Sequence, residues 1–120
     1  MAAIAALNKP APDLQKIVTD ALSPLVRRID AEGYYPETVM HALGAAGVFS
    51  QHADMQTATT GLASAADNIA VIGAVCGSTA FCTWCQNALV WYLAASGNTG
   101  LQQRLLPQLS HGSTLGGTGL

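Results

Sequence analysis

The sequence predicts an all-α fold, a helical bundle of about five helices that ends in the start of a strand. Apolar residues recur at intervals of three and four through most of the chain, which is the spacing of one helix face. Glycines and prolines interrupt this pattern at a few places, as they do at helix ends. Residues 68–96 carry no charge, which is typical of a helix that packs on several sides.

The first helix is predicted to start after Pro12 and to stop before Gly33. Pro24 lies inside this helix, and because proline lacks a backbone donor the helix should kink just before it. Pro36 opens a second, shorter helix, which Gly47 closes. A polar connector of sequence SQHADMQTATT comes next. The apolar residues that define the two helices are Leu14, Ile17, Val18, Ala21, Leu22, Leu25, Ile29, Val39, Met40 and Leu43.

The third and fourth helices are predicted to be separated by a Gly-Ser pair. The third runs from about Leu62 to Cys76. Glycine disfavours a helix interior and serine is a favoured N-cap, so Gly77 and Ser78 should end one helix and cap the next. The fourth helix then continues to about Ala95.

The last helix is predicted to start at Asn98 or Thr99 and to end at Gly112, with Pro107 breaking its regularity. Residues 113–120, STLGGTGL, are not expected to be helical. Three glycines in this stretch leave the backbone bare, as a strand or turn that passes close to a ligand requires.

The charge distribution predicts that other polypeptide covers part of this chain. Only 10% of the residues are charged, and from Asn68 onwards Arg104 carries the only formal charge. A free-standing domain needs charge on its outer face. The sequence therefore suggests an incomplete protein whose apolar surface packs against further protein.

A membrane span is the alternative explanation for the uncharged stretch, since residues 68–96 are long enough to cross a bilayer. Several polar residues lie near its middle, and no cluster of Lys or Arg flanks it to set an orientation. No membrane association is therefore expected. The polar residues are Ser78, Thr79, Thr83, Gln86 and Asn87.

The cysteines suggest a metal or redox site but are better explained by packing. Cys82 and Cys85 have the Cys-x-x-Cys spacing, but zinc needs four ligands, and His41, His52 and His111 lie far away without paired spacing. Free cysteine behaves as a small apolar residue. We therefore expect buried structural thiols, no metal, and a fourth helix at the centre of the protein.

Other partner classes receive no support from composition. The net charge is −2 and the five basic residues are scattered, so no nucleic-acid surface is expected. The N-terminus has no basic segment before its short alanine-rich run, which argues against a secretory signal and favours a cytoplasmic protein.

The order of these elements resembles the N-terminal helical domain of the FAD-dependent acyl-CoA dehydrogenases. The resemblance rests on "RRIDAEGYYP", "ETVMHALGAAGVF", "GSTAF" and "SGNTGLQQRLLPQLSHGSTLGGTGL" in this order. It implies a helical domain over residues 1–112 and, over 113–120, the start of a flavin-binding β-domain. Two departures are visible: the connector after Phe49 lacks the family's Gly-Gly-rich segment, and the sequence stops before the flavin signature.

The resemblance implies that the intact enzyme oxidises an acyl-CoA thioester between its α- and β-carbons, uses FAD and forms a homo-oligomer. It places the flavin contact at Thr118, Gly119 and Leu120, and the floor of the acyl pocket at Phe81, Cys85 and Leu89. Phe81 in that pocket implies short or compact acyl groups. No acid of this chain matches the catalytic carboxylate, so the chain alone is expected to be inactive and to bind no FAD.

Two other functions remain open at the level of sequence. A flavin-dependent monooxygenase of the same fold would share all of these features, because the catalytic glutamate that separates the two classes would lie elsewhere. A helical interaction module without chemistry would fold as a well-behaved monomer and bind a protein partner.

Overall fold

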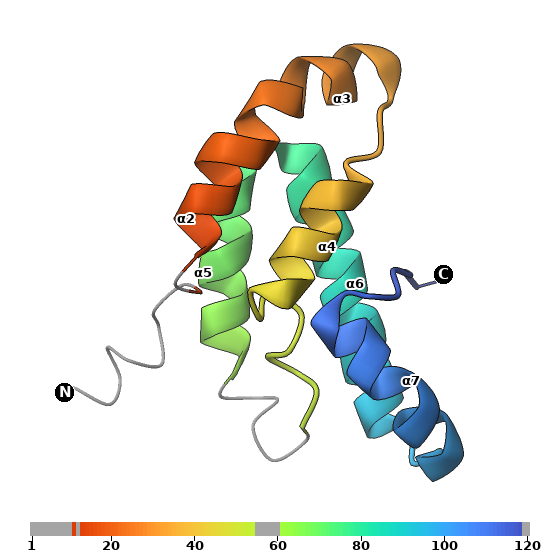
Figure 1. The fold of residues 1–120 in the computed structure, drawn as a ribbon. Helices are drawn as coiled ribbons and strands as arrows, with labels where there is room; N and C mark the ends of the chain where they lie inside the picture. The colour runs from red at the N-terminus through yellow and green to blue at the C-terminus, as the bar shows by residue number, and fades with distance from the viewer. Residues whose placement is uncertain (1–10, 12, 55–60, 119–120) are drawn as a thin grey trace, which may run out of the picture.

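The computed structural model describes residues 11, 13–54 and 61–118 of the 120-residue chain. The described residues form helices and connecting turns without a strand, which confirms the predicted all-α class. The helical elements in chain order are α2 (Leu14–Ile17), a π-helical turn (Val18–Leu22), a 3₁₀ turn (Ser23–Leu25), α3 (Val26–Glu32), α4 (Glu37–Ala45), α5 (Gly61–Gly73), α6 (Gly77–Ala95) and α7 (Thr99–His111) (Figure 1).

The first predicted helix is present but changes type along its length. The π-helical turn and the 3₁₀ turn lie between α2 and α3, and Pro24 lies in the 3₁₀ turn. Proline cannot donate the bond that a regular helix needs at this point, so the irregularity confirms the predicted kink. The helix ends before Gly33, whose φ of 65° places it in the left-handed region that glycine tolerates.

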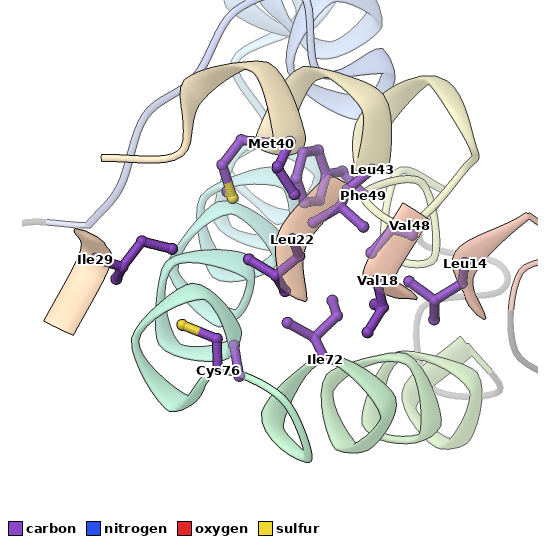
Figure 2. Packing of buried hydrophobic residues seen from close by; sticks show 12 residues of the cluster. Leu14, Val18, Leu22, Ile29, Met40, Leu43, Val48, Phe49, Ile72 and Cys76 are labelled. Carbon is purple, nitrogen blue, oxygen red and sulfur yellow. The ribbon is translucent and has the colours of Figure 1, made fainter. Parts of the chain in front are cut away.

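The main core lies where the first helical segment (residues 14–32), α4, α5 and the start of α6 meet. Figure 2 shows its side chains converging from these elements. Phe49, from the turn after α4, is the largest fully buried side chain there. A smaller apolar cluster between α6 and α7 contains Val90, Leu93 and Leu109. The main core comprises Leu14, Val18, Leu22, Ile29, Val39, Met40, Leu43, Val48, Phe49, Ile72, Cys76 and Ala80.

Helices α4 and α7 cross at a pair of glycines. A methyl group on Gly44 would lie 2.6 Å from the carbonyl oxygen of His111, and one on Gly112 would lie 2.7 Å from the Cα of Gly44. Only a bare backbone on both sides allows this approach. Gly112 also has a φ of 74° and ends α7.

The break between α5 and α6 is confirmed, but the predicted cap is wrong. Helix α5 ends at Gly73, three residues before the predicted end. Cys76 is the N-cap of α6, because its extended backbone turns its sulfur towards the N–H of Thr79, 3.4 Å away. Ser78 lies inside the first turn and is exposed.

Helix α7 contains Pro107 and runs without interruption from Thr99 to His111. Proline removes one backbone donor, which leaves the carbonyl of Gln103 without its helical partner. Both residues are exposed, so water can hydrate this carbonyl. The start at Thr99, with Asn98 as N-cap, agrees with the prediction.

The sequence suggested that α6 is buried on nearly all sides at the centre of the protein. The structure shows instead that one side of α6 is buried and another is exposed. Its buried face carries four polar residues, whereas three of its aromatic residues are exposed. The polar residues are Thr79, Thr83, Gln86 and Asn87.

Within the described residues, no helix has the length and apolar character needed to cross a membrane.

Candidate functional site

The candidate site is built around the segment that leaves the end of α7. This segment, residues 113–118, is not helical and turns back across the middle of α6 (Figure 1). It contains Thr118, the first of the three predicted flavin contacts. The other two, Gly119 and Leu120, lie outside the described residues.

A buried side chain of α6, Gln86, holds the middle of this segment, whose first two residues also bond to Gln108 of α7. Gln86 is completely buried. Its amide nitrogen donates to the carbonyl oxygens of Leu109, at 2.9 Å, and Thr114, at 3.1 Å. Its amide oxygen accepts from the backbone N–H of Gly116, at 2.9 Å. Both amide donors and the acceptor are therefore satisfied by the backbone that ends α7 and leaves it.

A second contact, made by a side chain of α4, holds the turn at the end of α7. His41 lies 2.6 Å from the carbonyl oxygen of Gly112 through its Nδ1. Because a carbonyl only accepts, Nδ1 carries the proton and donates it. The other ring nitrogen lies 3.5 Å from a carboxylate oxygen of Glu37, one turn earlier on α4. The end of α7 is thus held from α4 and from α6.

The three predicted acyl-pocket residues do not share one environment. Phe81 is 63% exposed and stacks on Trp84, with ring centroids 5.7 Å apart. Cys85 and Leu89 are half-buried under the C-terminal segment. A methyl group on Gly116 would lie 2.7 Å from a Leu89 Cδ atom, and one on Gly117 would lie 3.8 Å from the Cβ of Cys85. The structure therefore brings Cys85 and Leu89 to residues 116–117, just before the predicted flavin contacts, and leaves Phe81 on the surface.

Phe81 belongs to an aromatic surface that we call the outer face of α6, formed by Phe81, Trp84 and Tyr92. These side chains are 63%, 46% and 61% exposed. Steps of three and eight residues at 100° per residue keep them on one side of the helix. Soluble monomers rarely leave several neighbouring aromatic residues in water, so this face has the character of a contact surface.

A cavity of about 580 Å³ opens between α5 and α6 beside this face. Its walls are almost entirely apolar, and His52 stacks on Trp91 at its edge with ring centroids 4.3 Å apart. Asn87 also borders the cavity, but its amide atoms are buried and have no hydrogen-bond partner among the described residues. None of the predicted pocket residues lines it. The lining residues are His52, Leu62, Ala65, Ala66, Ile69, Trp84, Asn87, Ala88, Trp91, Tyr92 and Ala95.

The cysteines are free thiols, buried at Cys76 and half-buried at Cys82 and Cys85. Burial raises the pKa of the Cys82 thiol, and the neighbouring thiols Cys85 and Cys76 raise it further. A raised pKa keeps the thiol protonated, whereas a reactive cysteine needs a thiolate. Within the described residues, no group of three His, Cys, Asp or Glu side chains is placed to hold a metal ion.

Sequence reasoning missed the role of Gln86. In the sequence this residue counts only as a polar group that argues against a membrane span. A glutamine in the middle of an uncharged apolar helix is itself a signal, since burying an amide without partners is costly. Its partners lie 23 to 30 residues away, however, and no local pattern identifies them.

Comparison with protein families gives one match. Residues 12–113 match the sequence model described as "Acyl-CoA dehydrogenase, N-terminal domain". The chain matches no curated protein and no solved structure.

Proposed function

The chain belongs to the family of acyl-CoA dehydrogenase N-terminal domains, and on this premise we propose that it is the helical domain of an FAD-dependent acyl-CoA dehydrogenase-like oxidoreductase. The match over residues 12–113 is the observation that carries the proposal, because it covers nearly all of the described structure. In the intact enzyme this domain would supply part of the acyl-pocket wall and one edge of the flavin site.

The C-terminal segment suits an edge contact to FAD. Its glycines leave the backbone bare, and Gln86 ties Gly116 to α6, so the N–H and C=O groups beyond Gly116 can be presented in a fixed orientation. Thr118, Gly119 and Leu120 would supply these groups to the ring. The segment has no charged residue that could pair with a diphosphate, so other polypeptide would supply the rest of the FAD site. When bound, the flavin would accept hydride from the substrate.

The acyl group would lie against α6 at Phe81, Cys85 and Leu89. Cys85 and Leu89 already lie beside the segment proposed to meet the flavin, so they would be close to the reacting end of the substrate. Phe81 lies one helical turn from Cys85 and would occupy the volume that a long acyl chain needs. The proposal therefore favours a short or compact acyl group.

Beyond Phe81, the outer face of α6 at Trp84 and Tyr92 would be covered by the β-domain and by other parts of the enzyme, including other subunits. Three exposed aromatic residues on one helix side form the kind of surface that aromatic-rich protein interfaces bury.

The catalytic carboxylate that takes the α-proton would come from outside residues 1–120, because Asp67 is the last acid of the sequence and lies on α5.

The test is an anaerobic titration of the protein expressed from its whole reading frame. A dehydrogenase should purify with FAD, and a short-chain acyl-CoA should bleach its visible absorption without any other reductant. Bleaching only by an added flavin reductant, followed by oxygen consumption when substrate and air are admitted, would assign the monooxygenase instead. A colourless protein that binds no FAD would contradict both the dehydrogenase and the monooxygenase function. It would favour the helical interaction module without chemistry.

A further inference from the structure

We propose that Gln86 is a positioning residue, which sets the path of residues 114–116 and thereby the orientation of the backbone that meets the flavin. This inference rests on the proposed function for its flavin part alone. The placement of the segment by Gln86 is a property of the helical domain and can be tested without a cofactor.

Burial makes the hydrogen bonds of Gln86 obligatory. The side chain is 0% exposed, yet it carries two donors and an acceptor. An amide buried without partners would be strongly unfavourable, so the fold requires that backbone groups come to it. Leu109, Thr114 and Gly116 provide these groups, and the last two belong to the segment after α7.

The hydrogen bonds also fix the direction of the segment. Thr114 receives a hydrogen bond from the amide nitrogen and Gly116 gives one to the amide oxygen, so the side chain contacts the segment at two points two residues apart. Two such contacts fix both the position and the rotation of the intervening backbone. A methyl group on Gly116 would lie 2.7 Å from a Leu89 Cδ atom, so a side chain at this position would require the Leu89 side chain to move.

The anchored backbone leads directly to the proposed flavin contact. Thr118 is two residues beyond Gly116, so a change in the path at Gly116 reaches Thr118 without a further anchor of the same kind among the described residues. In the proposed enzyme the N–H and C=O groups at this point face the flavin. Gln86 would not touch the flavin itself and would act through the segment.

The first experiment measures amide hydrogen exchange at Gly116 in the 120-residue chain. Gln86→Met keeps the length of the side chain but removes its hydrogen bonds, and should speed exchange at Gly116 about tenfold or more. Gln102→Met is the matched control, since Gln102 donates to the carbonyls of Leu93 and Ala94 and does not contact the segment. It should leave exchange at Gly116 unchanged. Equal exchange in wild type and Gln86→Met would overturn the positioning role.

The second experiment measures FAD affinity in the protein expressed from its whole reading frame. Gln86→Met should raise the Kd for FAD about tenfold, which corresponds to about 1.4 kcal/mol. Gln102→Met should leave it unchanged. Normal affinity in Gln86→Met would overturn the flavin part of the inference even if exchange at Gly116 is faster. A wild-type protein without FAD would instead overturn the proposed function, and the exchange result would still decide the placement of the segment.

Gln86→Glu provides a pH-dependent readout at the same position. A carboxylate can accept from Gly116 but cannot donate to Leu109 and Thr114, whereas the protonated acid can donate to one of them. The FAD affinity of this variant should therefore rise towards wild type as the pH falls, while Gln86→Met should show no such recovery. Parallel pH profiles of the two variants would overturn the inference.

Discussion

At the scale of single residues, the Cys82 thiol is held in its neutral form. Its pKa lies above the ordinary value of 9.0 because burial disfavours the thiolate, and because Cys85 and Cys76 add repulsion. The folded chain thus binds this proton more tightly than the unfolded chain does. The stability that it contributes is fully present below about pH 9 and is lost as the pH rises through the folded pKa.

We predict that iodoacetamide alkylates Cys82 more slowly at pH 8 in the folded chain than in the same chain unfolded by urea, since only the thiolate reacts. The difference should shrink above pH 9. Peptide mass spectrometry resolves the three cysteines in one sample. Equal rates at pH 8 would show that the thiol is reactive and would reopen the redox interpretation.

At the scale of helices, α6 is capped by a sulfur atom that accepts two hydrogen bonds. The sulfur of Cys76 accepts from the N–H of Thr79 and, at 3.2 Å, from its hydroxyl. Cys76→Ala removes this acceptor and should lower the free energy of unfolding by about 1 kcal/mol, the usual loss for a cap. Urea denaturation monitored by circular dichroism measures it.

Ser78→Ala is the control for this cap, because Ser78 is exposed in the first turn. Its free energy of unfolding should stay within about 0.5 kcal/mol of wild type. The opposite order, with Ser78→Ala the more destabilising change, would place the cap at Ser78 as the sequence suggested.

The crossing of α4 and α7 makes a second prediction at this scale. A methyl group on Gly44 would meet the backbone of Gly112 and His111, which cannot rotate away as a side chain can. Gly44→Ala should therefore destabilise the chain by about 1 to 3 kcal/mol, the typical cost of overpacking. Thermal or urea unfolding measures the change.

Gly77→Ala is the matched control for Gly44→Ala. Apart from its chain neighbours and the backbone of its own helix, no atom of the described residues lies within 4 Å of a methyl group at Gly77, in the first turn of α6. This change should leave stability unchanged or raise it by up to about 1 kcal/mol, since alanine favours a helix. Equal losses for the two variants would contradict close packing at the crossing.

At the scale of the whole molecule, the sequence predicts where helices begin and end better than it predicts which side of each helix is buried. Pro24, Gly33 and Asn98 act locally, and local signals are what a sequence shows directly. In α6 nearly every position is apolar or small, so periodicity could not identify the inward side. Gln86 lies on that side, and its partners come from residues 109–116; such distant pairing has no local pattern.

The exposed outer face of α6 should make the 120-residue chain self-associate. Phe81, Trp84 and Tyr92 offer an apolar surface without a charge on the same helix. Multi-angle light scattering should show a mass that rises with protein concentration, and Trp84→Glu should reduce the rise. A monomer at all concentrations would favour a free-standing module.

The proposal that the outer face of α6 is a contact surface inside a larger flavoprotein is tested most directly by the exposure of Trp84. Trp91→Phe leaves Trp84 as the sole tryptophan of the 120-residue chain. Acrylamide quenching would be measured in the dilute, monomeric chain and in the protein expressed from its whole reading frame, where any tryptophan outside residues 1–120 is also replaced by phenylalanine. We predict strong quenching in the chain and weak quenching in the whole protein. Equal quenching in both would contradict the claim.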